Sequence, residues 1–295
     1  MKTVMDYFRL PPRYQCAGDI GVEIEVEGEN IPMATRYWRN EKDGSLRGES
    51  REFVLEKPST MKEVQMALKY LNLMYKKHNT VVHDSIRAGV HVHINAQKLT
   101  IIELYNFMTV YLVLEELLTE FCGEHRKGNL FCLRAGDAEV LISSIKRAAR
   151  TGMFRDLVVD ELRYSAMNVK ALGTYGSLEF RAMRGTRDLG LVEKWAEILL
   201  NLREVSKKFA DPTEVMQYYS AGNIKEFVIH CLGDNAEIFL AMPDYEAKVK
   251  AGMRLSQEVA YCVDWGKYIE KPTKLVGGLV FPVDIDFPDE PFEDF

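Results

Sequence analysis

Three separated segments of the chain alternate apolar residues with acidic, imidazole or guanidinium side chains. They are Gly21–Glu27, Gly89–Asn95 and Ser177–Arg181. Because successive side chains of a β-strand point to opposite faces of a sheet, each segment places its apolar residues on one face and its polar residues on the other. The sequence therefore predicts strands with one face toward a core and a second face that carries polar groups.

The polar faces of these strands carry residue types that bind divalent metal ions and phosphate. They hold Glu23, Glu25 and Glu27 in the first segment, His91, His93 and Asn95 in the second, and Glu179 and Arg181 in the third. Carboxylates are ligands of Mg²⁺, and a guanidinium group binds phosphate oxygens through two parallel hydrogen bonds. If the three apolar faces cover one core, the polar faces converge on a site for metal and phosphate.

Composition excludes several classes of protein. No apolar run reaches the roughly 20 residues that a membrane-spanning helix needs, and the N-terminus lacks the apolar run and cleavage site of a secretory signal. The five cysteines form no CxxC pair and no zinc-site spacing. We therefore expect a cytoplasmic protein with free thiols and no membrane partner.

The net charge of −6 comes from one end of the chain. Residues 284–295 hold six acidic residues and no basic one, so the rest of the chain is neutral. This balance argues against nucleic-acid binding driven by net charge, but a local basic patch remains open. The acidic tail is either a segment that binds a protein partner or a solvated terminus.

Periodicity along the chain predicts a strand and hairpin, a helix, a second strand and a second helix, followed by further helices. The expected helices are 59–78, 101–121, 137–150, 191–209, 212–219, 224–232 and 245–263, and a strand, turn and strand are expected within 164–184. We expect residues 1–210 to form the domain that carries the polar strands. Residues 211–295 would form a helical C-terminal extension.

Other interpretations of the polar residues stay open at this level. One alternative is that His91 and His93 supply two of the ligands of a zinc ion. No HExxH motif or Cys/His cluster in the sequence supplies the remaining ligands. Both histidines are also compatible with a structural role, and Glu179 with Arg181 is compatible with an ordinary salt bridge. The sequence lacks glycine-rich phosphate loops and any recognisable nucleophile with a base, so nucleophilic catalysis has no support.

Several motifs, in this order, resemble the amidoligase family of the carboxylate-amine ligase superfamily, which includes glutamine synthetase and glutamate-cysteine ligase. They are Gly21–Glu25, Asp43–Leu46, Glu52–Val54 with Pro58, Gly89–His93, Tyr164–Asn168, and Leu178–Arg181 followed by Gly185, Thr186 and Trp195. The resemblance covers roughly residues 18 to 205. It implies an α+β fold, in which an antiparallel sheet has helices packed on one face and a binding site on the other.

The resemblance also implies roles for individual residues. Its metal ligands would be Glu23, Glu25, Glu52, His91 and Glu179. His93 would lie toward the nucleotide, while Arg181 and Arg163 would hold the transferred phosphate. The implied cofactors are ATP and Mg²⁺, with Mn²⁺ as an alternative ion. Asp43 and Asn168 match family positions to which we assign no role.

The activity implied by the resemblance is ATP-dependent joining of a carboxylate and an amine, on a small molecule or a peptide, through an acyl-phosphate. Such chemistry depends on positioning and electrostatics and needs no protein nucleophile. The alternative is a catalytically inactive module with the ligase fold that recruits a partner through the acidic tail. Basic residues within 123–155 are candidates for binding an anionic substrate, including nucleic acid or an acidic peptide, but a solvated helix face explains them equally well.

Overall fold

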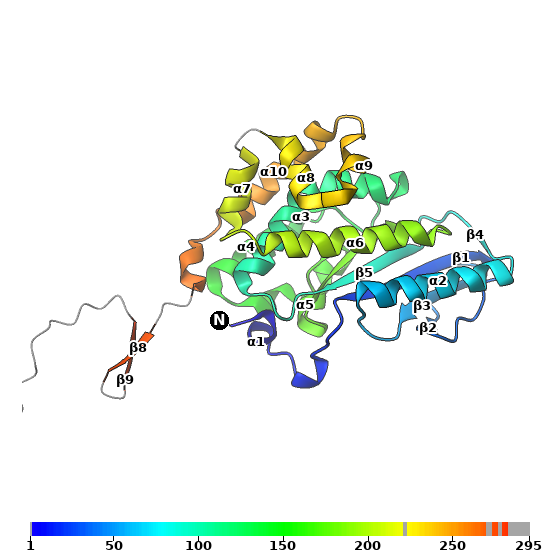
Figure 1. The fold of residues 1–295 in the computed structure, drawn as a ribbon, viewed down its shortest axis with the longest axis horizontal. Coiled ribbons are helices and arrows are strands. Elements are labelled where there is room, and N and C mark those ends of the chain that lie inside the picture. Colours follow the sequence, from blue (N-terminus) through cyan, green and yellow to red (C-terminus); the bar gives the residue numbers. More distant parts are fainter. Residues whose placement is uncertain (1, 221–222, 270–272, 277–278, 283–295) are drawn as a thin grey trace, which may run out of the picture.

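The centre of the protein is an antiparallel β-sheet of seven strands, seen in a computed structural model that describes residues 2–220, 223–269, 273–276 and 279–282 (Figure 1). The strands follow the order β2-β3-β1-β5-β7-β6, and β4 pairs with the far end of β1. Their bounds are β1 Ile20–Glu29, β2 Trp38–Glu41, β3 Ser50–Leu55, β4 Val81–Val82, β5 Gly89–Asn95, β6 Met167–Asn168 and β7 Ser177–Arg184. A separate pair consists of β8 Thr273–Val276 and β9 Leu279–Pro282.

Helices make up most of the remaining described chain. The α-helices are α1 Val4–Phe8, α2 Met61–Lys77, α3 Ile101–Cys122, α4 Glu139–Thr151, α5 Ala171–Thr174, α6 Leu189–Ser206, α7 Pro212–Ser220, α8 Ile224–Leu232, α9 Ala236–Leu240 and α10 Tyr245–Ala260. Short 3₁₀ turns occupy Pro12–Tyr14, Glu124–Arg126, Phe154–Leu157, Asp160–Tyr164, Gly233–Asn235 and Trp265–Tyr268. Within the part of the chain described here, no helix is both long and apolar enough to cross a membrane.

Helices α2, α3 and α6 pack on one face of the sheet, as Figure 1 shows. That face carries the apolar half of each alternating strand, and these side chains are fully buried: Val22, Ile24 and Val26 in β1, Val90, Val92 and Ile94 in β5, and Leu178 and Phe180 in β7. The expected fold class, an antiparallel α+β sheet with helices on one face, is therefore confirmed. The polar residues of the same strands lie on the opposite face of the sheet.

The two long helices that follow the first strands begin at threonine caps. Thr60 Oγ1 accepts a hydrogen bond from Glu63 N, and the Glu63 carboxylate accepts one in return from Thr60 N. Thr100 and Glu103 form the same reciprocal pair at the start of α3. A capping box of this kind satisfies two backbone donors that the helix itself leaves unpaired. It explains why α2 and α3 begin within two residues of the expected positions.

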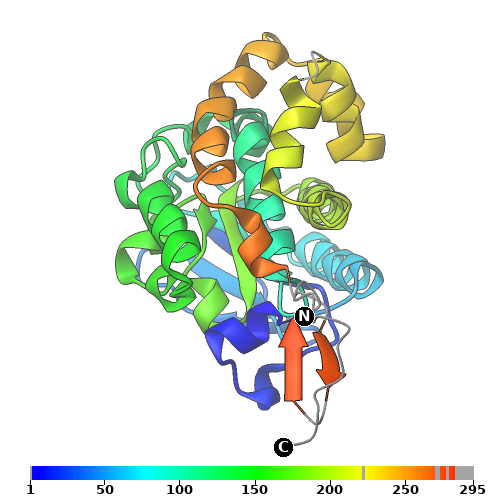
Figure 2. The same ribbon diagram turned by 90° about the vertical axis from the view of Figure 1, so that its left-hand side faces the viewer.

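Helix α3 is the centre of the hydrophobic core, with the sheet on one side and the C-terminal helices on the other. Figure 2 shows α10 running along it, and Gly252 of α10 lies directly against the main-chain carbonyls of Leu112 and Val113. One continuous apolar core extends from the sheet through α3 and α6 into α7, α8 and α10. The expected boundary at residue 210 stays a prediction, and the acidic segment 284–295 lies outside the described residues.

The sequence did not predict three short helices: α9 in the C-terminal part, and α1 and α5, which precede strands of the sheet. The local causes are clear for α1 and α5. Residues 4–8 form α1 because Thr3 and Asp6 make a local capping box and Arg9 ends the helix in the left-handed conformation. The turn expected near Gly173 between β6 and β7 is instead the short helix α5, and Gly176 then takes a positive φ of 69° before β7 begins. Both elements are too short to show an apolar period of their own.

Candidate active site

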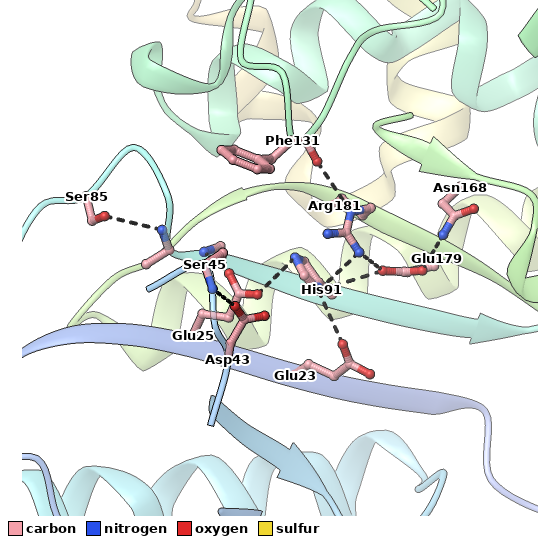
Figure 3. Close-up of polar contacts among 12 residues, drawn as sticks. Glu23, Glu25, Asp43, Ser45, Ser85, His91, Phe131, Asn168, Glu179 and Arg181 are labelled. Atoms are coloured by element: carbon pink, nitrogen blue, oxygen red, sulfur yellow. Dashed lines mark hydrogen bonds and ion pairs between the residues drawn. The ribbon is translucent and has the colours of Figure 1, made fainter. Parts of the chain in front are cut away.

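The polar residues of four strands converge on the open face of the sheet (Figure 3). Antiparallel pairing fixes this arrangement because residues directly opposite each other point to the same face. The opposed pairs are Glu23 with His91, Glu25 with Glu52, and His93 with Glu179. We call these six residues the acid–imidazole cluster.

His91 lies in the middle of the cluster. Its Nδ1 is 3.2 Å from Glu23 Oε2 and 3.7 Å from Glu179 Oε1, and its Nε2 is 3.9 Å from Glu25 Oε1. Figure 3 shows the ring between carboxylates from β1 and β7. Glu25 is fixed further by a hydrogen bond of 2.7 Å from the Gly89 N–H at the start of β5.

His93 lies one position further along the same face of β5. Its Nε2 is 3.5 Å from Glu23 Oε1, and its Nδ1 is 3.1 Å from the hydroxyl of Ser177. One ligand atom from each of Glu23, His93 and Glu179 lies within 4.8 Å of the other two, which is the spacing of groups that share a metal ion. The sequence placed His91, not His93, among the metal ligands, and the structure puts both imidazoles beside Glu23.

Arg181 brings a cation to the same face from β7. Its Nη1 donates to Glu179 Oε1 and lies 3.5 Å from His91 Nδ1. The other carboxylate oxygen of Glu179 accepts a hydrogen bond of 2.5 Å from Asn168 Nδ2 on β6. Asn168, to which the sequence analysis assigns no role, therefore orients Glu179.

Hydrogen bonds and charges within the cluster change the ionisation of its members. Burial alone would raise the pKa of Glu23, but hydrogen bonds with His91 and His93 lower the pKa far below its usual range. Burial likewise works against ionisation of Glu179, while the charges of His93 and Arg181 bring its pKa below the ordinary value. The same interactions with Glu23 and Glu179 outweigh burial at His93 and raise its pKa.

The pKa values of the other two carboxyl groups in the cluster are raised instead of lowered. Burial raises the pKa of Glu25, and only part of that effect is offset by His91. Burial together with the charges of Glu23, Glu25 and Asp43 raises the pKa of Glu52 to about 8. Carboxylates crowded in this way favour a cation between them, and the oxygen and imidazole donors are types that bind Mg²⁺ or Mn²⁺. The residues therefore fit a divalent metal ion.

Two cavities flank the cluster. The first, which we call the Tyr175 cavity, has a volume of about 240 Å³ and is lined by Glu23 and His93 together with Val22, Val54, Leu55 and Tyr175. The second, which we call the arginine cavity, has a volume of about 350 Å³ and is lined by Glu25 and His91 together with Arg87, Arg126, Arg163 and Arg181. The two histidines of β5 thus face different cavities.

Arg163 lines the arginine cavity at an exposed position. Its guanidinium is exposed and rests on the ring of Tyr164, 4.4 Å from the ring centroid, and it donates to the Tyr164 hydroxyl. Asp43 and Ser45 line the same cavity, and the Ser45 N–H donates to Asp43 at 2.5 Å. Arg163 and Arg181, which the sequence analysis groups as phosphate-binding residues, line the same cavity, and Arg181 also contacts Glu179.

Several basic residues that the sequence offered for binding an anionic substrate are paired within the protein. Arg134 forms ion pairs with Glu116 and Asp137, Lys146 with Glu258, and Lys127 with Glu120. Arg126 from the same group is different, because it is buried and lines the arginine cavity. No period or motif in the sequence marks Arg126, or the Phe131 ring that lies over the cluster in Figure 3.

Comparison with known protein families gives a match for this chain. A family profile described as "putative amidoligase enzyme" matches residues 54–203, which is half of the chain, and the protein belongs to this family. The matched region contains His91, His93, Arg163, Glu179 and Arg181, whereas Glu23, Glu25 and Glu52 precede it. No curated protein matches the sequence.

Proposed function

We propose that the protein is an ATP-dependent carboxylate-amine ligase that forms an amide or peptide bond through an acyl-phosphate. The observation that carries the proposal is the convergence of four carboxylates, two imidazoles and Arg181 on one sheet face between two cavities. Membership in the amidoligase family supports the ligase class. The ATP requirement and the acyl-phosphate are what the resemblance to the carboxylate-amine ligase superfamily implies, and the donor types in the cluster are compatible with both.

The two cavities favour different ligands. The Tyr175 cavity combines an aromatic ring and aliphatic side chains with Arg39 and Lys57, which suits a nucleotide base and its phosphates. We assign ATP to it, with His93 on the nucleotide side. The arginine cavity is polar and suits the carboxylate to be activated. The γ-phosphoryl group would then lie over the cluster between them.

Glu23, Glu25, Glu52, Glu179 and His91 would hold the metal ions in this scheme. When bound, Mg²⁺ neutralises charge on the phosphoryl oxygens during transfer. Arg181 would contribute a fixed positive charge at the same place, since Glu179 and the Phe131 carbonyl, 3.4 Å from its Nε, hold its guanidinium.

The reaction itself would proceed in two displacements. A carboxylate oxygen of the first substrate attacks the γ-phosphorus, and the bond to the leaving ADP breaks. The amine nitrogen of the second substrate then attacks the acyl carbon, phosphate leaves, and the amine proton passes to a basic group of the cluster. The protein supplies position and charge in both steps, which agrees with the lack of a recognisable nucleophile.

Calorimetric titration of ATP, with Mg²⁺ and with chelator, tests the proposal on the wild type, Glu25→Gln and Glu27→Gln. Glu27 lies on the same strand two residues further along and accepts a hydrogen bond from Arg47 N, outside the cluster. We expect Mg²⁺-dependent binding that weakens at least about 100-fold in Glu25→Gln, because a charged ligand is lost, and is kept in Glu27→Gln. Glu179→Ala should in addition abolish phosphate release with carboxylate and amine mixtures.

Absence of ATP binding in the wild type would contradict the proposal. It would favour the alternative of an inactive module with the ligase fold that recruits a partner. Retention of the whole set of charged side chains argues against that alternative, since nothing would maintain a dense set of buried carboxylates in an inert site.

A further inference from the structure

A third cavity lies at the end of the sheet where β7 leads into α6. Its volume is about 390 Å³, and residues of three chain segments line it: 82–84 at the end of β4, 123–125 after α3, and 184–187 between β7 and α6. We call it the Arg184 cavity. It shares no lining residue with the Tyr175 cavity or the arginine cavity, and no member of the acid–imidazole cluster lines it.

The guanidinium of Arg184 is held in this cavity by a neutral group. Its Nη1 donates to the main-chain carbonyl of Cys122, at the end of α3, at 3.2 Å. Gly123 makes room for this contact, because a Cβ at residue 123 would lie only 2.6 Å from Arg184 Nη1. The carbonyl fixes the position of the guanidinium but does not neutralise its charge.

Arg187 is held in the same way on another wall. Its Nη1 donates to Asn72 Oδ1 at 3.0 Å, and its guanidinium lies over the ring of Tyr75, 4.8 Å from the ring centroid. Both arginines are half-buried, and among the described residues neither has a carboxylate within ion-pair distance. A guanidinium group has five N–H donors, so each arginine keeps donors for a ligand.

The acidic groups beside the cavity are paired with imidazoles. Asp84 Oδ2 lies 3.0 Å from His125 Nε2, and Glu29 Oε1 lies 3.8 Å from His83 Nε2, with all four side chains more than half exposed. Among the described residues, these groups do not bring three ligand atoms within 4.8 Å of one another, as a shared metal ion would require. Two unpaired guanidinium groups also repel a cation, so the cavity favours an anion.

Thr186 adds a neutral donor between the two arginines in the chain. Its Oγ1 accepts a hydrogen bond of 3.0 Å from Asp188 N, and its hydroxyl hydrogen has no acceptor among the described residues. Two guanidinium groups and a hydroxyl offer more donors than the two oxygens of a carboxylate use. A phosphate group has more oxygens and more charge, and it suits guanidinium donors that approach from different walls.

We propose that the Arg184 cavity is a second anion site, in which Arg184, Arg187 and Thr186 bind a phosphate-type group. The group is either free phosphate or the phosphate of a small phosphomonoester. The inference goes beyond the proposed function and does not depend on it, because it involves neither the cluster nor a nucleotide.

The anion site would lie behind one of the cluster residues. Gly185 N donates to the Ala88 carbonyl at 2.9 Å, and a Cβ at residue 185 would lie only 3.0 Å from the main-chain oxygen of Glu25. The segment that holds the anion therefore packs against the main chain that carries Glu25. A bound phosphate group would fix this segment without contacting the Glu25 carboxylate.

Titrations followed by ³¹P NMR, with chelator and without nucleotide, test the site separately from ATP chemistry. The probes are inorganic phosphate and glycerol 3-phosphate, with acetate as a competing carboxylate. We expect saturable binding of one or both phosphate probes, and acetate should bind at least about tenfold more weakly than the better one. The probe that binds more tightly identifies the source of the phosphate group.

Substitution then assigns the binding to this cavity. Arg184→Gln and Arg187→Gln should each weaken it at least about tenfold, since each removes a charge-assisted hydrogen bond. Arg163→Gln, in the arginine cavity, and Arg147→Gln, an exposed arginine beside Asp156, are controls that should keep the wild-type affinity. If one of the two cavity variants does not fold, the other serves together with Thr186→Val, which should weaken binding severalfold.

Three results would overturn the inference. They are absence of saturable binding to the wild type up to about 10 mM of either phosphate probe, unchanged affinity in the folded cavity variants, and loss of binding in Arg163→Gln with retention in Arg184→Gln. Acetate that binds as tightly as phosphate would contradict the assigned ligand class. Calorimetry of ATP binding decides the proposed function independently, because these titrations contain neither metal ion nor nucleotide.

Discussion

Replacement of Glu52 by glutamine should stabilise the metal-free protein at high pH and leave it unchanged at low pH. Glu52 lies directly opposite Glu25, and burial with the neighbouring carboxylates raises its pKa from 4.5 to about 8. A raised carboxyl pKa means that the folded protein disfavours the charged form. Below pH 4.5 the Glu52 carboxyl group is neutral in both the folded and the unfolded state and does not change the free energy of unfolding. Above pH 8 the group is charged in both states, and its charge destabilises the folded state by the full amount.

The pKa shift of Glu52 sets the size of the expected stabilisation. A change from 4.5 to about 8 corresponds to at most about 5 kcal/mol, and solvent screening of a half-buried group reduces this to about 2 kcal/mol. Glutamine has the same shape without the charge. We therefore expect Glu52→Gln to raise the melting temperature by about 4 °C at about pH 9, and by less than about 1 °C at about pH 4.

Thermal unfolding in the presence of chelator, at the two pH values, measures the difference. Glu237→Gln is the control, because Glu237 is an exposed glutamate on α9, away from the cluster. A melting temperature of Glu52→Gln that exceeds the wild type equally at both pH values, or that falls below it at the higher one, would refute the argument. Added Mg²⁺ should then stabilise the wild type more than the variant, because the cation relieves the same repulsion.

Three further substitutions test the packing around the site. Gly252→Ala would place a Cβ 2.3 Å from the Leu112 carbonyl oxygen and should lower the free energy of unfolding by about 3 kcal/mol in a urea titration; wild-type stability would contradict the α3–α10 contact. In Gly89→Ala the added Cβ crowds Arg126 and should reduce kcat/KM at least about tenfold in a phosphate-release assay, at a stability cost below about 2 kcal/mol. Unchanged kinetics would contradict the view that the wall of the arginine cavity at Gly89 is part of the active site. Asn168→Ala removes the donor to Glu179 Oε2 and should weaken Mn²⁺ binding about 10- to 100-fold in a spectroscopic titration; equal affinity would exclude an orienting role.

Alternation along the strands made most of the cluster predictable. Val22, Ile24 and Val26 are buried, so Glu23 and Glu25 must point to the other face once β1 is a strand. The same reasoning applies to the residues of β5. Alternation within a strand does not predict the order and register of the strands. These place Glu23 opposite His91 and His93 opposite Glu179.

Arg126 shows where sequence reasoning ends. In the sequence it is one of several basic residues after α3, and its neighbour Lys127 pairs with Glu120 as a surface residue does. Its burial depends on a turn that passes over the ends of β5 and β7, and this contact joins positions about 56 residues apart. A single sequence carries no local signal for a contact at that separation, because neither periodicity nor spacing links the two segments.

An irregularity in β7 connects Arg126 to Arg181. Between the pairs Val92 with Phe180 and Val90 with Met183, β7 has one more residue than β5, so the strand contains a bulge. Strict alternation would turn Arg184 toward the core, whereas the bulge gives that place to Met183, which is fully buried.

The bulge also frees the carbonyls of Arg181 and Ala182 from regular pairing, and these are the two groups to which Arg126 donates. One inserted residue thus keeps an arginine out of the core and creates the acceptors that hold a second arginine in the cavity wall. The alternation that predicts the cluster must fail at this point for the arginine cavity to form. For this reason, a variant that removes the bulge, by deletion of Ala182, should disturb the arginine cavity more than the Tyr175 cavity.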